Sequence, residues 1–428
     1  MISPMYNSKI KLLFGLCHLF YFSRANQFFV FYLDCSRISL TLRENCECYE
    51  RSASIICESA ELLDISSALV PIGTEKLVIS GANLSNLTDT LLPSTLTDLS
   101  VWNCKLTHLT KSPPISIRFI DFYNNSLTSV RNVVKLPNLE RLNVRFNSLT
   151  SLSSAVTPAL THLDVGDNQL FYIPDLIESN IRSIMAQRNR ISFIDRLPVS
   201  LQELIVPWNN ITSFSFFYDQ VDKNGGEKRL QNLRSLDLYS NERLDFCSES
   251  LILLEKKYIN PSLSQLYLGK TATMEFPTWI CSIFPNIAKL SFYEGKINGI
   301  RMKHVTTICN KTTVIELHGN PLSAGIDARF VAKLFPNLRH LTLSGSASLH
   351  CDCQLFRWIK LRDVKVDFAN FSAICASPAE WRDFRLHSSK PPVDCGRGNI
   401  AQDEPGIQHN TTSPPEFQKF YAIYLSFP

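Results

Sequence analysis

The sequence is poor in charged residues and has almost no excess of either sign. Charged residues are 19% of the 428 positions, and 43 Lys and Arg against 39 Asp and Glu leave a formal net charge of +4. A net charge of +4 over a chain of this length is too small to suggest a nucleic-acid-binding protein. Hydrophobic residues make up 45% of the chain, which excludes disorder throughout it. Glycine is scarce, at 15 residues, and shows no collagen-like period.

Enzyme motifs and long apolar runs are missing as well. The sequence contains no H-E-x-x-H, no G-x-S-x-G and no protein-kinase signature. It therefore predicts no enzyme, no catalytic residue, no metal site and no cofactor. After the first 40 residues, no stretch reaches the ~18 apolar residues needed to span a bilayer.

Residues 1–25 have the layout of a secretory signal. Lys9 and Lys11 precede an apolar stretch at 12–22, and small residues follow up to Ala25. A second apolar run at 28–33 leaves the cleavage site open. We interpret 1–25 as a signal peptide or a signal anchor, with a buried N-terminal element of a cytosolic protein as the weaker alternative.

The middle of the chain repeats the pattern L-x-x-L-x-L-x-x-N/C-x-L. Leu96, Leu99, Val101, Cys104 and Leu106 form one copy. About twelve copies occupy residues 74–348, starting at 74, 96, 117, 139, 160, 181, 201, 233, 263, 287, 312 and 338. Positions 4 and 6 of each copy alternate, so both side chains point into the core from a short strand. The later copies are longer and leave room for a helix on the far side, such as 248–258.

The ninth position of the pattern is asparagine in seven copies. These residues are Asn125, Asn147, Asn168, Asn189, Asn209, Asn241 and Asn320. An amide both donates and accepts, so it can satisfy backbone groups of a turn that has no ladder partner. We interpret these asparagines as structural.

The pattern resembles the leucine-rich repeat. The resemblance implies an α/β solenoid, a horseshoe with a parallel sheet on its concave side. Cysteine-rich segments at 35–73 and 349–395 resemble the disulfide-bonded caps that flank the repeats of extracellular members. The implied pairs are Cys35–Cys48 and Cys46–Cys57 in the N-terminal cap, and Cys351–Cys375 and Cys353–Cys395 in the C-terminal cap.

Other cysteine arrangements are compatible with the sequence. Four cysteines could hold zinc, but the Cys-x-Cys spacing and the signal-like start favour disulfides. Cys281 and Cys309 fall on neighbouring repeats and could form a bridge, whereas the states of Cys104 and Cys247 are undetermined.

Positions 3, 5 and 7 of each copy are expected to face the concave surface, where large aromatic and arginine side chains gather. One group is Trp102, Phe119, Tyr123, Arg141, Arg145 and Phe146, and a second is Trp208, Tyr239, Tyr267 and Tyr293. Such side chains dominate protein interfaces, so we predict that both groups bind a protein partner. Asp121, Asp164, Asp237 and Glu316 share one lane of the same face, and we interpret this lane as solvated rather than catalytic.

Further features concern the surface and the ends. N-x-S/T sequons predict glycosylation at Asn83, Asn86, Asn124, Asn210, Asn310, Asn370 and Asn410. The long insertion before residue 233, including 214–217, is predicted to be a surface loop. Residues 396–428 lack a period and are predicted to be a disordered tail.

Together these patterns predict a secreted or cell-surface module that recognises a protein partner through its concave face. One alternative is the ectodomain of a signalling receptor whose membrane span is missing from this chain. Another is a structural matrix component. No nucleic acid is expected as a partner, and membrane association would require an N-terminal anchor or a missing C-terminal span.

Overall fold

The structure is a computed structural model. It describes residues 21–22, 29–30, 32–38, 44, 46–58, 70–84, 92–109, 113–218, 230–255, 257–301, 307–366, 373–388 and 390–395. The predicted tail at 396–428, and all of the predicted signal segment except Tyr21 and Phe22, lie outside these residues.

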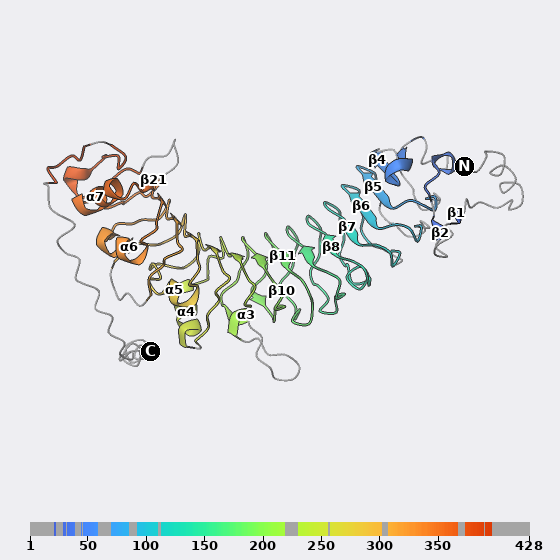
Figure 1. Cartoon of the computed structure of the whole chain (residues 1–428), viewed down its shortest axis with the longest axis horizontal. Helices are drawn as coiled ribbons and strands as arrows, with labels where there is room; N and C mark the ends of the chain where they lie inside the picture. The colour runs from blue at the N-terminus through green and yellow to red at the C-terminus, as the bar shows by residue number, and fades with distance from the viewer. Residues whose placement is uncertain are drawn as a thin grey trace, which may run out of the picture.

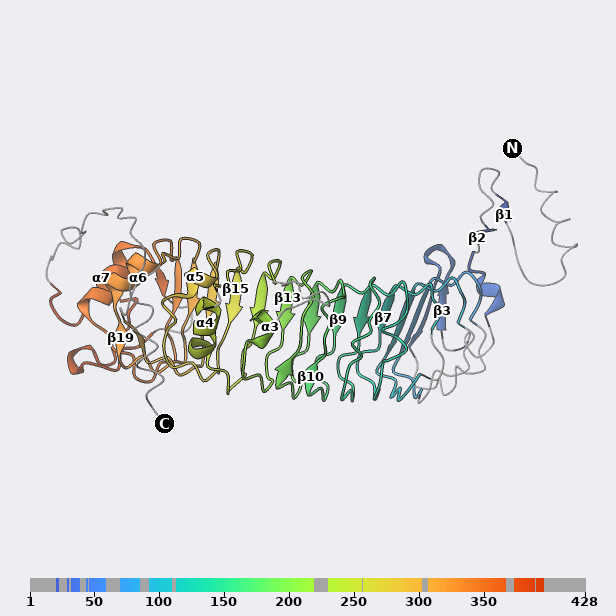
Figure 2. The same cartoon turned by 90° about the horizontal axis from the view of Figure 1, so that it is seen from below.

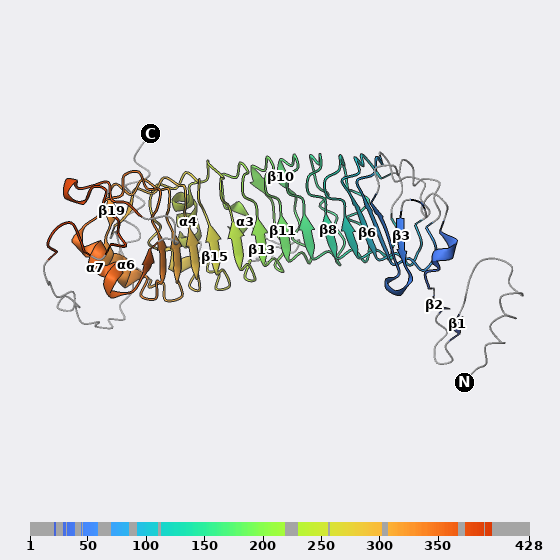
Figure 3. The same cartoon turned by 90° about the horizontal axis from the view of Figure 1, so that it is seen from above.

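One long sheet of fifteen strands runs through the molecule in chain order. Its strands are β3 (Cys46–Tyr49), β4 (Ser54–Glu58), β5 (Lys76–Ser80), β6 (Asp98–Trp102), β7 (Phe119–Asp121), β8 (Arg141–Asn143), β9 (His162–Asp164), β11 (Ser183–Met185), β13 (Glu203–Ile205), β14 (Ser235–Asp237), β15 (Gln265–Tyr267), β16 (Lys289–Ser291), β18 (Val314–Glu316), β20 (His340–Thr342) and β21 (Lys365–Val366). All neighbours pair in parallel except β3 and β4. Figures 1 and 3 show these strands side by side along the inner side of a shallow arc. The predicted α/β solenoid with a parallel concave sheet is confirmed.

The remaining elements lie outside the long sheet. The helices are α3 (Ser215–Tyr218), α4 (Phe246–Glu255), α5 (Ile280–Ile283), α6 (Ala328–Leu334), α7 (Cys353–Leu361) and the 3₁₀ turns η1 (Cys35–Arg37), η2 (Glu50–Ser52) and η3 (Ala379–Trp381). The strand pairs are β1 (Tyr21–Phe22) with β2 (Phe29–Val30), β10 (Tyr172–Ile173) with β12 (Phe193–Ile194), and β17 (Gly299–Ile300) with β19 (Gly325–Ile326). In Figures 1 and 2, α3, α4 and α5 lie on the convex side of the arc.

The strands form where the repeat alternates apolar and polar side chains. In β6, for example, Leu99 and Val101 are fully buried and the residues around them are half-buried. The register stacks equivalent residues, so Leu99 faces Ile120 and Ile120 faces Leu142 in successive strands. Within the described residues, β5 to β20 supply twelve such strands in the long sheet, because β3, β4 and β21 belong to the ends.

The repeat asparagines bind the backbone, as the sequence predicts. Asn147 donates from Nδ2 to the carbonyl oxygens of Phe122 and Val144, at 2.9 and 3.0 Å, and accepts from the Leu127 N–H at 2.8 Å. Each asparagine thereby links its own turn to the preceding repeat. Cys104 replaces asparagine with a buried thiol that donates to the Trp102 carbonyl oxygen at 3.2 Å.

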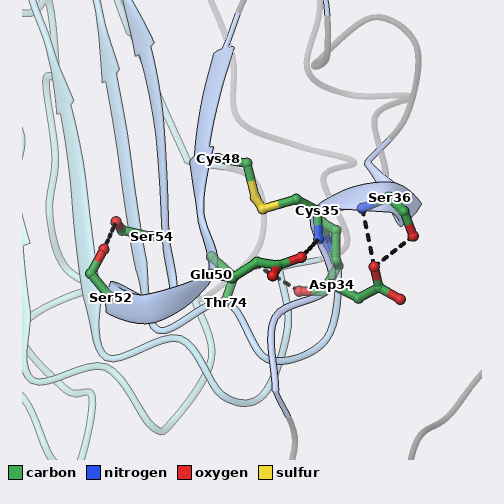
Figure 4. The surroundings of a disulfide bond; sticks show 9 residues. Asp34, Cys35, Ser36, Cys48, Glu50, Ser52, Ser54 and Thr74 are labelled. Atoms are coloured by element: carbon green, nitrogen blue, oxygen red, sulfur yellow. Dashed lines mark hydrogen bonds between the residues drawn. A yellow bond between two sulfur atoms is a disulfide. The ribbon is translucent and has the colours of Figure 1, made fainter.

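Disulfides close both ends of the solenoid. The N-terminal bonds are Cys35–Cys48 and Cys46–Cys57, and the C-terminal bonds are Cys351–Cys375 and Cys353–Cys395, which are the pairs that the family resemblance implies. A fifth bond, Cys281–Cys309, joins two repeats. Figure 4 shows the first of them, with the Cys35 N–H donating to the Glu50 carboxylate at 3.1 Å. The Cys247 thiol donates to the Glu275 carbonyl oxygen at 3.1 Å.

Residues 214–217 contradict the prediction of a surface loop. Phe214, Phe216 and Phe217 are at most 1% exposed and pack with Phe246, Tyr258 and Phe284. The extra length of this repeat folds inward at α3 because three large aromatic side chains gain more from burial than from solvent contact. The rest of that insertion, 219–229, lies outside the described residues. The helix expected at 248–258 is α4, which begins at Phe246 and ends at Glu255.

Candidate partner-binding surface

The eighth position of every repeat has a left-handed backbone. Its φ lies between +48° and +72° at Gly81, Asn103, Asn124, Phe146, Asp167, Arg188, Trp208, Ser240, Lys270, Glu294, Gly319 and Gly345. The neighbouring repeat fixes this conformation, since the position-8 N–H donates to its carbonyl, as Trp208 does to Tyr239 at 2.8 Å. Glycine and asparagine adopt positive φ readily, whereas a bulky residue there is an outlier. Phe146, Arg188 and Trp208 are therefore placed at an energetic cost.

Position 8 follows the strand, so its side chains form a row along one edge of the concave sheet, next to position 7. Contacts join these two rows without a break from Tyr123 to His318. We call the following set the rim stripe: Tyr123, Arg145, Phe146, Asp167, Arg188, Trp208, Tyr239, Lys270, Tyr293, Glu294 and His318. The stripe crosses nine strands, from β7 to β18, which at ~4.8 Å per strand gives a length of about 40 Å.

The first half of the stripe alternates rings and ions. The rings of Tyr123 and Phe146 meet edge to face at 5.4 Å, and the Arg145 guanidinium lies 5.0 Å from the centre of the Phe146 ring. Arg145 Nε is 2.6 Å from an Asp167 carboxylate oxygen, and Arg188 approaches the same carboxylate at 3.5 Å. Asp167 thus joins the two groups that the sequence separated.

The second half is a stack of rings. The Arg188 guanidinium lies 4.8 Å from the centre of the Trp208 ring, which meets Tyr239 edge to face at 5.3 Å. Tyr239 stacks on Tyr293 at 4.6 Å, and Tyr293 stacks on His318 at 4.9 Å.

The Tyr239–Tyr293 stack spans an intervening repeat because Gly269 has no side chain. A Cβ at Gly269 would lie 2.8 Å from the Tyr239 ring and 2.2 Å from the Tyr293 carbonyl oxygen. A glycine at position 7 is therefore required for the two rings to meet.

Hydrogen bonds and charges hold the stack in place. The Tyr239 hydroxyl donates to the Glu294 carboxylate at 2.6 Å, and Lys270 pairs with the same carboxylate at 2.9 Å. The hydrogen bond from Tyr239, with help from Lys270, lowers the pKa of Glu294. Burial raises the pKa values of Tyr239 and Tyr293, so both phenols remain protonated at neutral pH.

The structure brings six of the ten predicted binding residues into the stripe. Phe146 and Trp208 occupy position 8 rather than positions 3, 5 and 7, and Trp208 is 43% exposed. Sequence reasoning missed Asp167, Arg188, Lys270, Glu294 and His318. The available signal was a run of large or charged residues at position 8, where the turn favours glycine or asparagine.

The other four predicted residues are not joined to the stripe by these contacts. Trp102 is half-buried at the end of β6, and Tyr267 donates its hydroxyl hydrogen to Gln265 at 2.9 Å. The guanidinium carbons of Arg118 and Arg141 lie 5.5 and 5.6 Å from the centre of the Phe119 ring. Phe119 and Arg141 border a hollow of about 280 Å³ on the long sheet, which His162, Asp121 and Asp164 also line.

The acidic lane accepts hydrogen bonds from the backbone. Asp121, Asp164 and Asp237 each accept a hydrogen bond from the N–H two residues later, at 2.9–3.0 Å, and Asn143 does the same in β8. Asp121, Asp164 and Asp237 are half-buried, and this burial raises the pKa of all three. Asp121 and Asp164 stand two strands apart, about 10 Å by strand spacing.

Four of the seven predicted glycosylation sites, Asn83, Asn124, Asn210 and Asn310, are exposed, and Asn86, Asn370 and Asn410 lie outside the described residues.

In the part of the chain that the structure describes, no group of three or more His, Cys, Asp or Glu could hold a metal ion. No helix of that part is both long and apolar enough to cross a membrane.

The structure is similar to several solved structures, at different levels. One chain of the octameric complex of Latrophilin 3, Unc5D and FLRT2, whose leucine-rich-repeat component is FLRT2, is 17% identical over 82% of this chain and 99% of its own length, with a TM-score of 0.54. An internalin from Listeria monocytogenes is 16% identical over 75% and 88%, with a TM-score of 0.53. YopM from Yersinia enterocolitica is 22% identical over 71% of this chain, which spans 62% of YopM, with a TM-score of 0.49.

No protein-family model and no curated protein matches the sequence. The repeat register, the asparagine turns, the terminal disulfides and the likeness to FLRT2 and internalin agree on the architecture. The chain is a leucine-rich-repeat solenoid with a disulfide-bonded cap at each end.

Proposed function

We propose that this solenoid is a secreted or cell-surface recognition module that binds a protein partner with its concave side, and that the rim stripe makes the main contact. The observation that carries the proposal is the left-handed backbone at Phe146, Arg188 and Trp208. Strained conformations persist where function selects them. Phe146, Arg188 and Trp208 present two aromatic rings and a guanidinium at position 8, where glycine would adopt the same positive φ at a lower conformational free energy.

The chemistry of the stripe suits a protein interface. Trp, Tyr and Arg dominate interface hot spots because they combine large rigid area with a polar group. The stacked rings and paired ions restrain one another before binding, so a partner need order fewer side chains. A stripe of about 40 Å also accommodates an interface of standard size.

The five disulfides support the extracellular part of the proposal. Such bonds persist in oxidising compartments and are rare in reducing ones. FLRT2, to which the fold is similar, is part of a complex with Latrophilin 3 and Unc5D. We extend only the mode of action, protein recognition, to this chain.

The test uses the full chain, expressed with its disulfides formed and added to living cells. A photoreactive phenylalanine at position 208 should crosslink a discrete protein, and the same residue at position 193 should not. Phe193 is a matched control because it is 48% exposed and lies in β12, outside the long sheet. Trp208→Gly combined with Arg145→Ala should weaken cell binding by about 30-fold or more, as for loss of a hot spot. Retained affinity in that variant, or equal crosslinking from position 193, would refute the assignment of the stripe.

Localisation is tested separately by fractionation of producing cells. The proposal expects the protein in the medium or on the cell surface, with its cap cysteines oxidised. A soluble cytosolic pool with reduced thiols would overturn the extracellular assignment while leaving the stripe testable in vitro.

A further inference from the structure

A small cavity lies where the last repeat meets the C-terminal cap. It has a volume of about 220 Å³ and is lined from both sides of that junction, by residues of α6 and the turn after it and by residues of α7 and the turn after it. We call it the seam pocket. Its position at the end of the solenoid separates it from the rim stripe.

The floor of the seam pocket is apolar. Phe335, Trp358 and Val364 line it and are 1%, 6% and 5% exposed. Ligand pockets usually measure about 300–1,000 Å³, so this volume fits one amino-acid residue rather than a drug-sized molecule.

Two exposed arginines, Arg339 and Arg362, also line the pocket. The backbone holds both: Arg339 donates from its N–H to Thr313 at 2.9 Å and accepts from the Lys365 N–H at 2.9 Å, and the Arg362 N–H donates to Trp358 at 3.0 Å. They therefore approach the cavity from the two sides of the seam.

Neither arginine has a carboxylate partner in the described part of the chain. By contrast, Arg118, Arg145, Arg188 and Arg196 are all paired with acids. The acid nearest in sequence, Asp363, is exposed and forms no ion pair among the described residues. The seam pocket thus combines an apolar floor with two guanidinium groups that have no carboxylate partner among the described residues.

We propose that the seam pocket binds the carboxyl terminus of a peptide that ends in an apolar residue. The planar guanidinium donates two parallel hydrogen bonds to a carboxylate, which gives both strength and direction. The apolar floor accepts the adjoining side chain. This site is independent of the rim stripe and of the function proposed for it.

The test uses the full chain with ¹⁵N-labelled tryptophan and follows the indole resonances by NMR. N-acetyl-leucine is the probe, and N-acetyl-leucinamide is its uncharged match. The resonance assigned to Trp358 should shift saturably with the acid, at a roughly millimolar dissociation constant as expected for a ligand of about a dozen atoms. The amide should bind about tenfold or more weakly because it cannot form a charge-assisted hydrogen bond.

Two variants and a matched control locate the effect. Arg339→Gln and Arg362→Gln should each weaken binding of the acid by about tenfold and leave binding of the amide unchanged. Arg182→Gln is the control, because Arg182 occupies the same repeat position as Arg339 and donates its N–H to the preceding repeat at 2.7 Å. It should bind the acid like the parent chain. Equal shifts by acid and amide, the absence of saturation, or an equal loss in Arg182→Gln would overturn the proposal.

Discussion

Replacement of Trp208 tests whether the rim stripe is placed at a cost to the backbone. Trp208 has a φ of +52°, in the left-handed region. A glycine there should be more stable than an alanine, which reverses the usual order of these two residues. The comparison isolates the backbone, since both variants lose the same side-chain contacts.

The magnitude follows from four terms. Both variants lose the edge contact with Tyr239, ~0.5–1.5 kcal/mol, and the Arg188 interaction, ~0.5–1 kcal/mol. Only Trp208→Gly also removes the left-handed strain of ~1–2 kcal/mol, against a glycine entropy cost of ~0.5–1 kcal/mol. Trp208→Ala should therefore lose about 1–2.5 kcal/mol of unfolding free energy, and Trp208→Gly about 0.5–1 kcal/mol less than that.

Urea unfolding monitored by circular dichroism measures the difference, with the slope m checked for constancy. Tyr239 is the control position, because it is the adjacent stripe residue and its φ is not positive. There the order should be the usual one, with Tyr239→Ala more stable than Tyr239→Gly by ~0.5–1 kcal/mol. The difference between the two positions should amount to about 1–2 kcal/mol.

One result would refute the reasoning. If Trp208→Ala unfolds at the same urea concentration as Trp208→Gly, or at a higher one, position 8 is not strained. Backbone strain would then not mark a functional surface, whatever the outcome of the crosslinking experiment.

Two further predictions concern the interior. Asn241→Ala should lower the unfolding free energy by about 3 kcal/mol, because it removes three hydrogen bonds at a fully buried site: those to the Val206 and Leu238 carbonyls and the one from the Ile211 N–H. The control Asn210→Ala, at an exposed position, should cost less than ~0.5 kcal/mol. Similar urea midpoints for the two variants would contradict the structural role of Asn241. Asp237→Asn should raise the unfolding free energy at pH 7. Burial raises the pKa of the Asp237 carboxyl in the folded state, so the folded state binds more protons than the unfolded state. The parent chain therefore loses stability as the pH rises above about 4, the pKa of an aspartate in the unfolded chain. The amide introduced at position 237 can still accept a hydrogen bond from the Tyr239 N–H, as Asn143 does from the Arg145 N–H. In urea titrations, the stability gain of Asp237→Asn over the parent chain should vanish below about pH 4. A gain that does not depend on pH would contradict this prediction.

The fold could be predicted from the sequence because its determinants are local and repeated. Leu99, Ile120 and Leu142 stack in the register that the pattern implies, and Asn147 binds the backbone groups that an amide can satisfy. The implied cap disulfides are present as well.

The rim stripe was only partly predictable from the sequence, because it depends on the backbone conformation at position 8 and on a glycine that leaves room between two rings. The pattern identified Tyr239 and Tyr293 but not the gap at Gly269 through which they stack. It did not show that position 8 is left-handed, so the link from Asp167 to Arg188 was missed. The burial of Phe214 was missed for a similar reason, since a polar insertion follows it and tertiary packing decided its place.

The two ends of the long sheet bear on polymerisation. A row of parallel strands could in principle grow by adding strands from another molecule to either end. At one end β21 pairs through only two residues, and a short edge strand offers few unpaired groups to a newcomer. At the other end β3 runs against the direction of the row, and the Cys35–Cys48 bond fastens η1 to it. The caps therefore do more than cover apolar side chains: they leave a two-residue strand at one end and an antiparallel strand at the other, so neither end presents the long parallel edge that a second horseshoe would extend.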